Sequence, residues 1–176
     1  QFCVRMKEML GEEYAAFYAS YDLPKYQALR INPLKTERDT FLLQAPFSLN
    51  RVPWTTNGYY YSGNDQPGRH PYHEAGVYYI QEPSAMAPAE YLMAEPGERI
   101  LDLCAAPGGK SSQIACSMQG EGLIVCNEIH PARAKILSEN IERMGVCNAL
   151  VTNETPQKLS DNFREYFDRI LVDAPC

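Results

Sequence analysis

The second half of the chain alternates short apolar runs with longer segments in which apolar residues recur at helical spacing. Short runs bounded by turn residues predict buried strands, and the longer segments predict helices. The strands are expected at residues 99–103, 123–127, 149–152 and 169–172, with helices from 110 onward and at 131–144, and a helical or irregular segment at 155–166. Strands that alternate with helices form a parallel sheet with right-handed crossovers, so the fold class is α/β.

The first half has a different pattern, with one long amphipathic stretch followed by short strands and many turns. Residues 2–21 predict an amphipathic helix, or two shorter helices if Gly11 interrupts it. Further elements are expected as a strand at 26–33, a helix after the Thr36-x-x-Asp39 signature, strands at 47–52 and 59–61, an apolar segment at 75–80, and a helix from Ser84, as its cap, to about residue 93. These patterns predict a small α+β domain at residues 1–74, followed by an α/β domain at residues 75–176.

Composition and charge limit what the chain can bind. It has 176 residues, which suggests one domain with a small appendage, and 45% of them are hydrophobic. The net charge is −6, and neither residues 1–98, with 8 basic and 12 acidic side chains, nor residues 99–176, with 8 and 10, form a basic unit. A strong sequence-independent grip on phosphates needs clustered Lys and Arg. Aromatic residues near Arg51 and Arg69 fit either stacking on unpaired bases or covering a small sheet.

The cysteines and histidines favour reduced thiols and no metal site. The six cysteines form no C-x-x-C pair and lie at positions 3, 104, 116, 126, 147 and 176. The sequence shows neither a signal peptide nor an apolar run long enough to span a membrane, so a soluble cytoplasmic protein is expected. His70, His73 and Glu74 have no second ligand pair, which favours a solvated loop over a metal centre.

The stretch RILDLCAAPGGK, residues 99–110, joins the first strand of the expected parallel sheet to the following helix. Ligands of open α/β sheets bind beyond the carboxyl ends of the strands, beside a glycine-rich turn that lets the backbone approach closely. A P-loop needs glycine where Cys104 stands, and the dinucleotide fingerprint G-x-G-x-x-G is absent. S-adenosylmethionine (SAM) is the remaining nucleotide-like ligand. Its sulfonium and amino acid need an acidic strand end, here Asp102, and a turn that the ligand can approach closely, rather than a phosphate cradle.

Four motifs give the chain a family resemblance. They are LRIN at 29–32, YIQEPS at 79–84, DLCAAPGGK at 102–110 and DAPC at 173–176. Together they resemble the Nop/Sun family of RNA 5-methylcytosine methyltransferases, in the order found in bacterial members that methylate cytosine in 16S ribosomal RNA. The resemblance implies a Rossmann-like class I methyltransferase core, SAM as cofactor and RNA as partner. A full sheet of this class has about seven strands, so the four expected here predict an N-terminal portion.

The resemblance also implies which residues bind the cofactor. The loop positions are Cys104, Ala105, Ala106, Pro107, Gly108, Gly109 and Lys110. The Lys110 amine either reaches the cofactor carboxylate or faces solvent. Glu128, after the second strand, is expected to accept both ribose hydroxyls. Family members often have an aspartate after the third strand that contacts the adenine amino group, and the corresponding position here is Thr155 or Asn153.

Asp173 and Cys176 of the DAPC motif carry the expected chemistry, and Asp173 also lies at the cofactor site. Carbon 5 of cytosine accepts a methyl group only after a thiolate has added at carbon 6. Asp173 is expected to stabilise charge near N3 and the exocyclic amine. In DNA cytosine methyltransferases the Pro-Cys cysteine is the nucleophile, whereas in the RNA family it assists release and the nucleophile follows the fifth strand. The loop favours the RNA branch, so Cys176 is expected to assist release and the fragment to be inactive alone.

Two other functions remain open on the sequence. A DNA cytosine-5 methyltransferase would use Cys176 as its nucleophile, and a non-catalytic module would bind SAM or RNA without methyl transfer. The target nucleotide and the oligomeric state also remain open.

Overall fold

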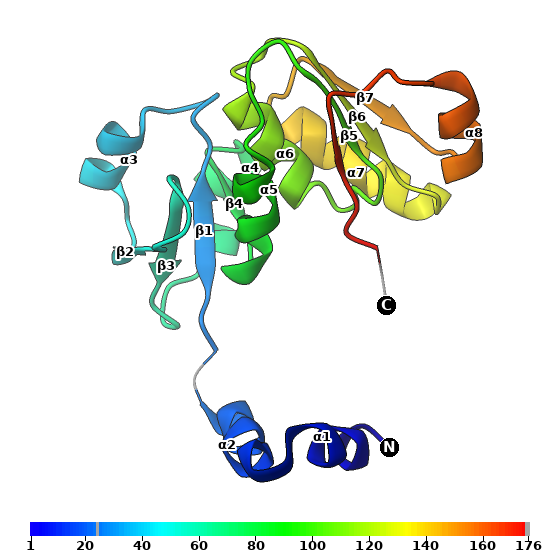
Figure 1. The fold of residues 1–176 in the computed structure, drawn as a ribbon. Coiled ribbons are helices and arrows are strands. Elements are labelled where there is room, and N and C mark those ends of the chain that lie inside the picture. Colours follow the sequence, from blue (N-terminus) through cyan, green and yellow to red (C-terminus); the bar gives the residue numbers. More distant parts are fainter. Residues whose placement is uncertain (24, 175–176) are drawn as a thin grey trace.

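The computed structural model describes residues 1–23 and 25–174, which form two four-stranded sheets and the helices around them (Figure 1). The first sheet is antiparallel and the second is parallel. The parallel sheet belongs to the second half of the chain, where strands and helices alternate as the sequence predicts.

Two short helices precede the sheets: α1 (Phe2–Leu10) and α2 (Tyr14–Ala19), separated by a 3-10 turn that begins at Gly11. Gly11 follows α1 with a φ of 52° and a ψ of −119°, a backbone conformation that favours glycine. The stretch with helical periodicity therefore folds as the two shorter helices. None of their residues is buried, and Figure 1 shows both helices apart from the sheets.

The antiparallel sheet has the strand order β2-β3-β1-β4 and carries its own small core. Its elements are β1 (Ala28–Ile31), α3 (Arg38–Gln44), β2 (Leu49–Arg51), β3 (Gly58–Tyr61), a 3-10 turn (Pro67–Arg69), α4 (Pro71–Glu74) and β4 (Tyr78–Ile80). One face of the sheet buries Leu29, Ile31, Phe41, Tyr59 and Tyr78. Tyr59 is thus a core residue of this sheet, which supports the covering role for the aromatic cluster over base stacking.

Strand β4 belongs to the antiparallel sheet, so this sheet continues past the domain boundary expected at residue 74. A 3-10 turn (Ser84–Met86) and helix α5 (Ala87–Leu92) follow. The expected cap at Ser84 is wrong: Glu82 instead accepts the Ala85 N–H at 3.1 Å. Helix α3 is confirmed, but its N-terminal position is Glu37, and no side chain caps it.

The parallel sheet has the order β7-β6-β5-β8. Its elements are β5 (Arg99–Asp102), α6 (Gly109–Ser117), β6 (Leu123–Asn127), α7 (Pro131–Arg143), β7 (Ala149–Thr152), α8 (Pro156–Asn162) and β8 (Arg169–Leu171). All three strand pairs are parallel, and β5 lies between β6 and β8. This is the order of the first four strands of a doubly wound Rossmann-like sheet, as the sequence predicts.

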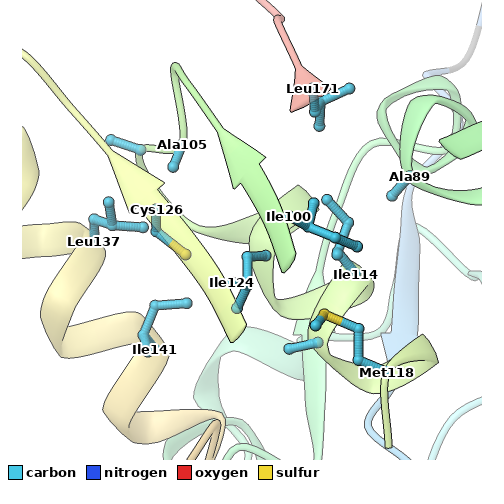
Figure 2. Packing of buried hydrophobic residues seen from close by; sticks show 12 residues of the cluster. Ala89, Ile100, Ala105, Ile114, Met118, Ile124, Cys126, Leu137, Ile141 and Leu171 are labelled. Carbon is cyan, nitrogen blue, oxygen red and sulfur yellow. The ribbon is translucent and has the colours of Figure 1, made fainter. Parts of the chain in front are cut away.

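Side chains along β5 and β6 alternate between two apolar layers. Ile100 and Ile124 lie on the face covered by α5, α6 and α7, and Figure 2 shows the cluster that they form there. Leu101 and Val125 lie on the other face and pack against Leu159 of α8. Because both faces are buried, these strands read as continuous apolar runs rather than as an alternating pattern.

The end of α7 fixes the antiparallel sheet to the parallel one. Asn32, directly after β1, is buried and donates from Nδ2 to the carbonyl oxygens of Gly76 and Met144, both at 2.8 Å. Arg143 of α7 donates to the carbonyl oxygen of His73 at 2.7 Å. Gly76 has a φ of 69°, and a Cβ there would lie 2.1 Å from the Arg143 carbonyl oxygen. The junction therefore leaves no room for a side chain at position 76.

Gly76→Ala should destabilise the chain strongly, because the new methyl group meets a backbone carbonyl. Gly97→Ala is the matched control, since Gly97 also has a positive φ, 86°, but nothing lies within 4 Å of its Cβ position. The control should cost about 1–2 kcal/mol through backbone strain. Gly76→Ala should cost about 1–3 kcal/mol more through overpacking. Urea denaturation measures both, and equal losses would show that the junction is looser than described.

Candidate functional site

A cavity of about 560 Å³ opens at the carboxyl ends of β5, β6 and β8. The chain passes from β5 to β6 on one side and reaches β8 on the other, so the cavity lies where the strand order reverses. Open α/β sheets bind their ligands at this switch point. The lining residues are 79–82, 85, 102–107, 109–110, 127–130, 133, 156, 173 and 174.

The turn between β5 and α6 is held in place by the strands and helix beside it. The Ala105 N–H donates to the carbonyl oxygen of Asn127 at 2.8 Å, and the Gly108 N–H donates back to Ala105 at 2.8 Å. Gly108 has a φ of 108°, a conformation that favours glycine. Asn140 of α7 donates from Nδ2 to the Pro107 carbonyl at 2.8 Å. The predicted cofactor loop is therefore one fixed turn, and residues 104–107, 109 and 110 line the cavity.

Asp102, the last residue of β5, is a buried carboxylate in the cavity wall, with 1% of its surface exposed. Its Oδ2 accepts a hydrogen bond from Ser111 Oγ at 2.7 Å, and its Oδ1 has no hydrogen-bond partner within the described residues. Burial raises the pKa of Asp102 to about 6. A buried carboxylate oxygen that lacks a partner fits a ligand with positive charge.

Lys110 and Asp173 meet in the cavity wall, although 63 residues separate them in the sequence. The distance between Lys110 Nζ and Asp173 Oδ2 is 2.6 Å. Lys110 lies in the first turn of α6, and Asp173 comes two residues after the end of β8. The amine of Lys110 thus points to the site rather than only to solvent, and the ion pair fixes the Asp173 carboxylate at the cavity.

Glu128, directly after β6, presents a second buried carboxylate, with 4% of its side chain exposed. Its Oε1 accepts the His130 N–H at 2.9 Å, and its Oε2 lies 3.3 Å from Arg133 Nη1. Arg133 also donates from Nη2 to the Ala106 carbonyl at 2.9 Å, so it connects Glu128 to the turn. Each carboxylate oxygen can accept a further hydrogen bond, which suits a pair of neighbouring hydroxyl groups.

The two candidates for adenine contact have other partners in the structure. Asn153 donates from Nδ2 to the carbonyl oxygen of Glu128 at 2.6 Å, and Thr155 accepts the Lys158 N–H at 3.3 Å as the cap of α8. Neither lies in the cavity wall, whereas the neighbouring Pro156 does. Asn153 therefore braces the segment that carries Glu128.

Several polar or aromatic residues of the cavity wall were not among the site residues expected from the sequence, among them Tyr79, Gln81 and Arg133. The acidic strand end at Asp102 was visible in the motif, whereas Arg133 lies in the first turn of α7, five residues after Glu128, and pairs with it. Tyr79 and Gln81 come from the other sheet and gave no comparable signal, because their place depends on how the two sheets pack.

Cys176 and Pro175 lie outside the described residues, so the structure reaches only Asp173 and Ala174 of the DAPC motif. The five cysteines within the described ranges are free. Across residues 1–23 and 25–174, no three His, Cys, Asp or Glu side chains come together as a metal site. None of the helices in these ranges is both long and apolar enough to cross a membrane.

Comparison with known families assigns both halves of the chain. Residues 1–83 match the N-terminal domain of 16S rRNA methyltransferase RsmF, and residues 89–176 match 16S rRNA methyltransferase RsmB/F. Ribosomal RNA small subunit methyltransferase F from Enterobacter sp. (strain 638) is 37% identical over 187 residues, and the Citrobacter koseri protein of the same name is 38% identical over 186. The matches cover 100% and 99% of this chain but 39% of each relative, so the chain spans about two fifths of their length.

Solved structures share the fold. A methyltransferase homologue from Pyrococcus horikoshii has a TM-score of 0.87 and 31% identity, over 99% of this chain and 58% of its own. NSun6 from Pyrococcus horikoshii, solved with SFG, has a TM-score of 0.85 over 99% of this chain and 70% of its own, but its identity of 20% supports the fold alone. The 31% identical structure and the family matches confirm a Rossmann-like methyltransferase core that follows an N-terminal domain.

Asp102 should make the stability of the chain depend on pH. Its pKa in the folded chain, about 6, exceeds its ordinary value of 3.8, so its stabilising contribution is present below about pH 4 and is lost as pH rises through 6. Asp102→Asn mimics the protonated form. At pH 7.5 it should be more stable than the parent by up to about 3 kcal/mol, with a smaller difference at pH 4.

Thermal unfolding between pH 4 and 8 measures this dependence. Asp22→Asn, at an exposed position, is the control and should leave the pH profile unchanged. A constant stability difference between Asp102→Asn and the parent across this range would contradict the raised pKa.

Proposed function

Because the chain belongs to the 16S rRNA methyltransferase RsmB/F family, we propose that it forms the SAM site of an enzyme that methylates carbon 5 of a cytosine in small-subunit ribosomal RNA. The curated relatives, named ribosomal RNA small subunit methyltransferase F, support this substrate. The chain matches 39% of their length, so reaction and substrate are proposed for the whole protein of which this chain forms a part. We place that protein in the cytoplasm.

The cavity at the switch point is the observation that carries the proposal. It is bounded by the glycine turn and contains two buried carboxylates, Asp102 and Glu128. SAM combines a positively charged sulfonium and ammonium with a ribose that offers two hydroxyl groups. The unpartnered Oδ1 of Asp102 fits the positive charge, and Glu128 fits the hydroxyls. A dinucleotide cofactor would instead need the G-x-G-x-x-G turn, which this sequence lacks.

The residues of this chain divide the work between binding and chemistry. The turn at 104–109 lets the backbone approach the cofactor closely, and Glu128 holds the ribose. SAM supplies a methyl group on positively charged sulfur. Asp173, fixed by Lys110, stabilises charge that develops on the cytosine ring. The target base must leave its helix for carbon 6 to be attacked.

Asn153 and Thr155 take supporting roles in this proposal. The Asn153 side chain donates to the carbonyl oxygen of Glu128, and the Thr155 side chain caps α8. The adenine contact is therefore assigned to Pro156, the first residue of α8 and the one residue of segment 153–156 in the cavity wall.

Cys176 is proposed to assist release, as the resemblance to the RNA enzymes implies. The family match supports this role over that of nucleophile, which belongs to DNA cytosine methyltransferases. Release removes the carbon-5 proton and expels the thiolate from carbon 6, which restores the aromatic ring.

SAM binding to this chain tests the cofactor site. Glu128→Gln should weaken SAM binding by about tenfold to a hundredfold, because the oxygen of a buried amide can accept only one of the two hydrogen bonds from the ribose hydroxyls. Glu154→Gln is the matched control: Glu154 pairs with Lys158 at 2.9 Å, and its side chain is 42% exposed. Isothermal titration calorimetry measures both. No uptake of SAM by the parent chain, or equal affinity in all three proteins, would reject the assigned site.

A second prediction concerns the thiol. In a polypeptide extended to the length of the curated relatives, Cys176→Ser should accumulate a covalent protein–RNA adduct, because methylation proceeds while release is slowed. Denaturing gels with radiolabelled 16S ribosomal RNA detect the adduct. Loss of the adduct together with loss of methyl transfer would instead make Cys176 the nucleophile.

A further inference from the structure

Arg30 is a charged side chain inside the molecule, far in sequence from the cofactor turn. It lies in the middle of β1, between Leu29 and Ile31, which both pack into the core of the antiparallel sheet. Because side chains alternate along a strand, Arg30 lies on the opposite face. Its hydrogen bonds to Gly109 and Ser112 direct it to the first turn of α6, and only 1% of its surface is exposed.

The guanidinium of Arg30 donates to four neutral acceptors. Nε donates to Gln81 Oε1 at 3.1 Å, and Nη2 donates to the Gly109 carbonyl at 3.0 Å and to Ser112 Oγ at 2.8 Å. Nη1 lies 3.8 Å from Cys116 Sγ. The fixed fork of a guanidinium suits acceptors in several directions, which a single ammonium does not match.

Burial of this charge is expensive, and no ion pair compensates it. Within residues 1–23 and 25–174, no carboxylate lies at ion-pair distance from Arg30. Desolvation lowers the pKa of the guanidinium. A well-packed apolar side chain usually stabilises a buried position at least as well as a charge does. A contribution to the fold alone therefore does not explain arginine here.

The acceptors of Arg30 belong to the cavity. Gly109 and Gln81 both lie in its wall, and Gly109 begins helix α6 directly after the cofactor turn. Tyr79 completes the contact, because its ring lies 5.9 Å from the Arg30 guanidinium and about 3 Å from the Cβ position of Gly109. One side chain of the antiparallel sheet thus holds the start of α6 and one wall of the cavity.

We propose that Arg30 is a positioning residue for the SAM site: by holding the Gly109 carbonyl, Ser112 and Gln81 together, it keeps the cofactor turn in its binding conformation. This inference rests on the SAM binding proposed above. It makes the N-terminal domain, residues 1–83, a structural part of the cofactor site, in addition to any contact that this domain makes with RNA.

Asn32, directly after β1, supplies a matched control. It is also buried, and it also joins the two sheets: it donates to Gly76 and Met144 and accepts from the Cys116 thiol at 3.4 Å, and none of these three residues lines the cavity. A purely structural role for Arg30 predicts that Arg30→Gln and Asn32→Ala behave alike. A positioning role predicts that they lose comparable stability and differ in SAM affinity.

Isothermal titration calorimetry on the parent and the two variants separates these roles. Arg30→Gln should weaken SAM by about tenfold or more, from the loss of hydrogen bonds to a charged donor. Asn32→Ala should bind SAM within about twofold of the parent. Arg30→Lys should recover part of the affinity, because an ammonium retains some of the bonds. Unchanged affinity in Arg30→Gln, or an equal loss in Asn32→Ala, would overturn the proposal.

Two further measurements keep the proposal testable by itself. Amide hydrogen exchange without SAM should be about tenfold faster at residues 109–112 in Arg30→Gln and unchanged there in Asn32→Ala. This readout decides the role of Arg30 even if the parent takes up no SAM, a result that would reject the proposed function instead. If Arg30→Gln does not fold, Ser112→Ala removes one acceptor alone and should still weaken SAM. Parent-like SAM affinity in that variant would reject the positioning role of Arg30.

Discussion

The parallel pairing of β5 with β6 on one side and with β8 on the other brings three strand ends to one edge of the sheet. Each end carries a carboxylate that lines the cavity: Asp102 as the last residue of β5, Glu128 after β6 and Asp173 after β8. Because the strands run in the same direction, residues far apart in sequence meet in one cavity. A different strand order would separate them, so the site depends first on this pairing and only then on individual contacts.

A second constraint is the fit between the two sheets. Asn32 and Gly76 hold the antiparallel sheet to α7, while Arg30 holds it to the first turn of α6. The cofactor turn is therefore fixed from two sides: by Asn140 and Arg133 of α7, and by Arg30 of β1. The N-terminal unit and the methyltransferase core thus share a buried polar junction rather than a simple linker.

Much of this architecture could be predicted because both faces of the parallel sheet are buried. Continuous apolar runs located β6 and β7 at the observed residues. The resemblance pointed to the turn, Glu128, Lys110 and Asp173, all of which contribute to the cavity wall. Local hydrogen bonds were harder to predict, since a polar side chain near a strand end can serve backbone or ligand. The Ala85 N–H, for example, is bonded by the Glu82 carboxylate rather than by the expected cap, Ser84. Contacts between the sheets, such as Arg30 to Gly109 over 79 residues, depend on docking that no local pattern encodes.

The most direct test of the central claim is a crystal structure of the chain with SAM. The cofactor should occupy the hollow at the ends of β5, β6 and β8, with its ribose hydroxyls on the Glu128 carboxylate and its sulfonium methyl group toward Asp173. Density for SAM outside this hollow, or a ribose without contact to Glu128, would contradict a methyl-donor site at the switch point.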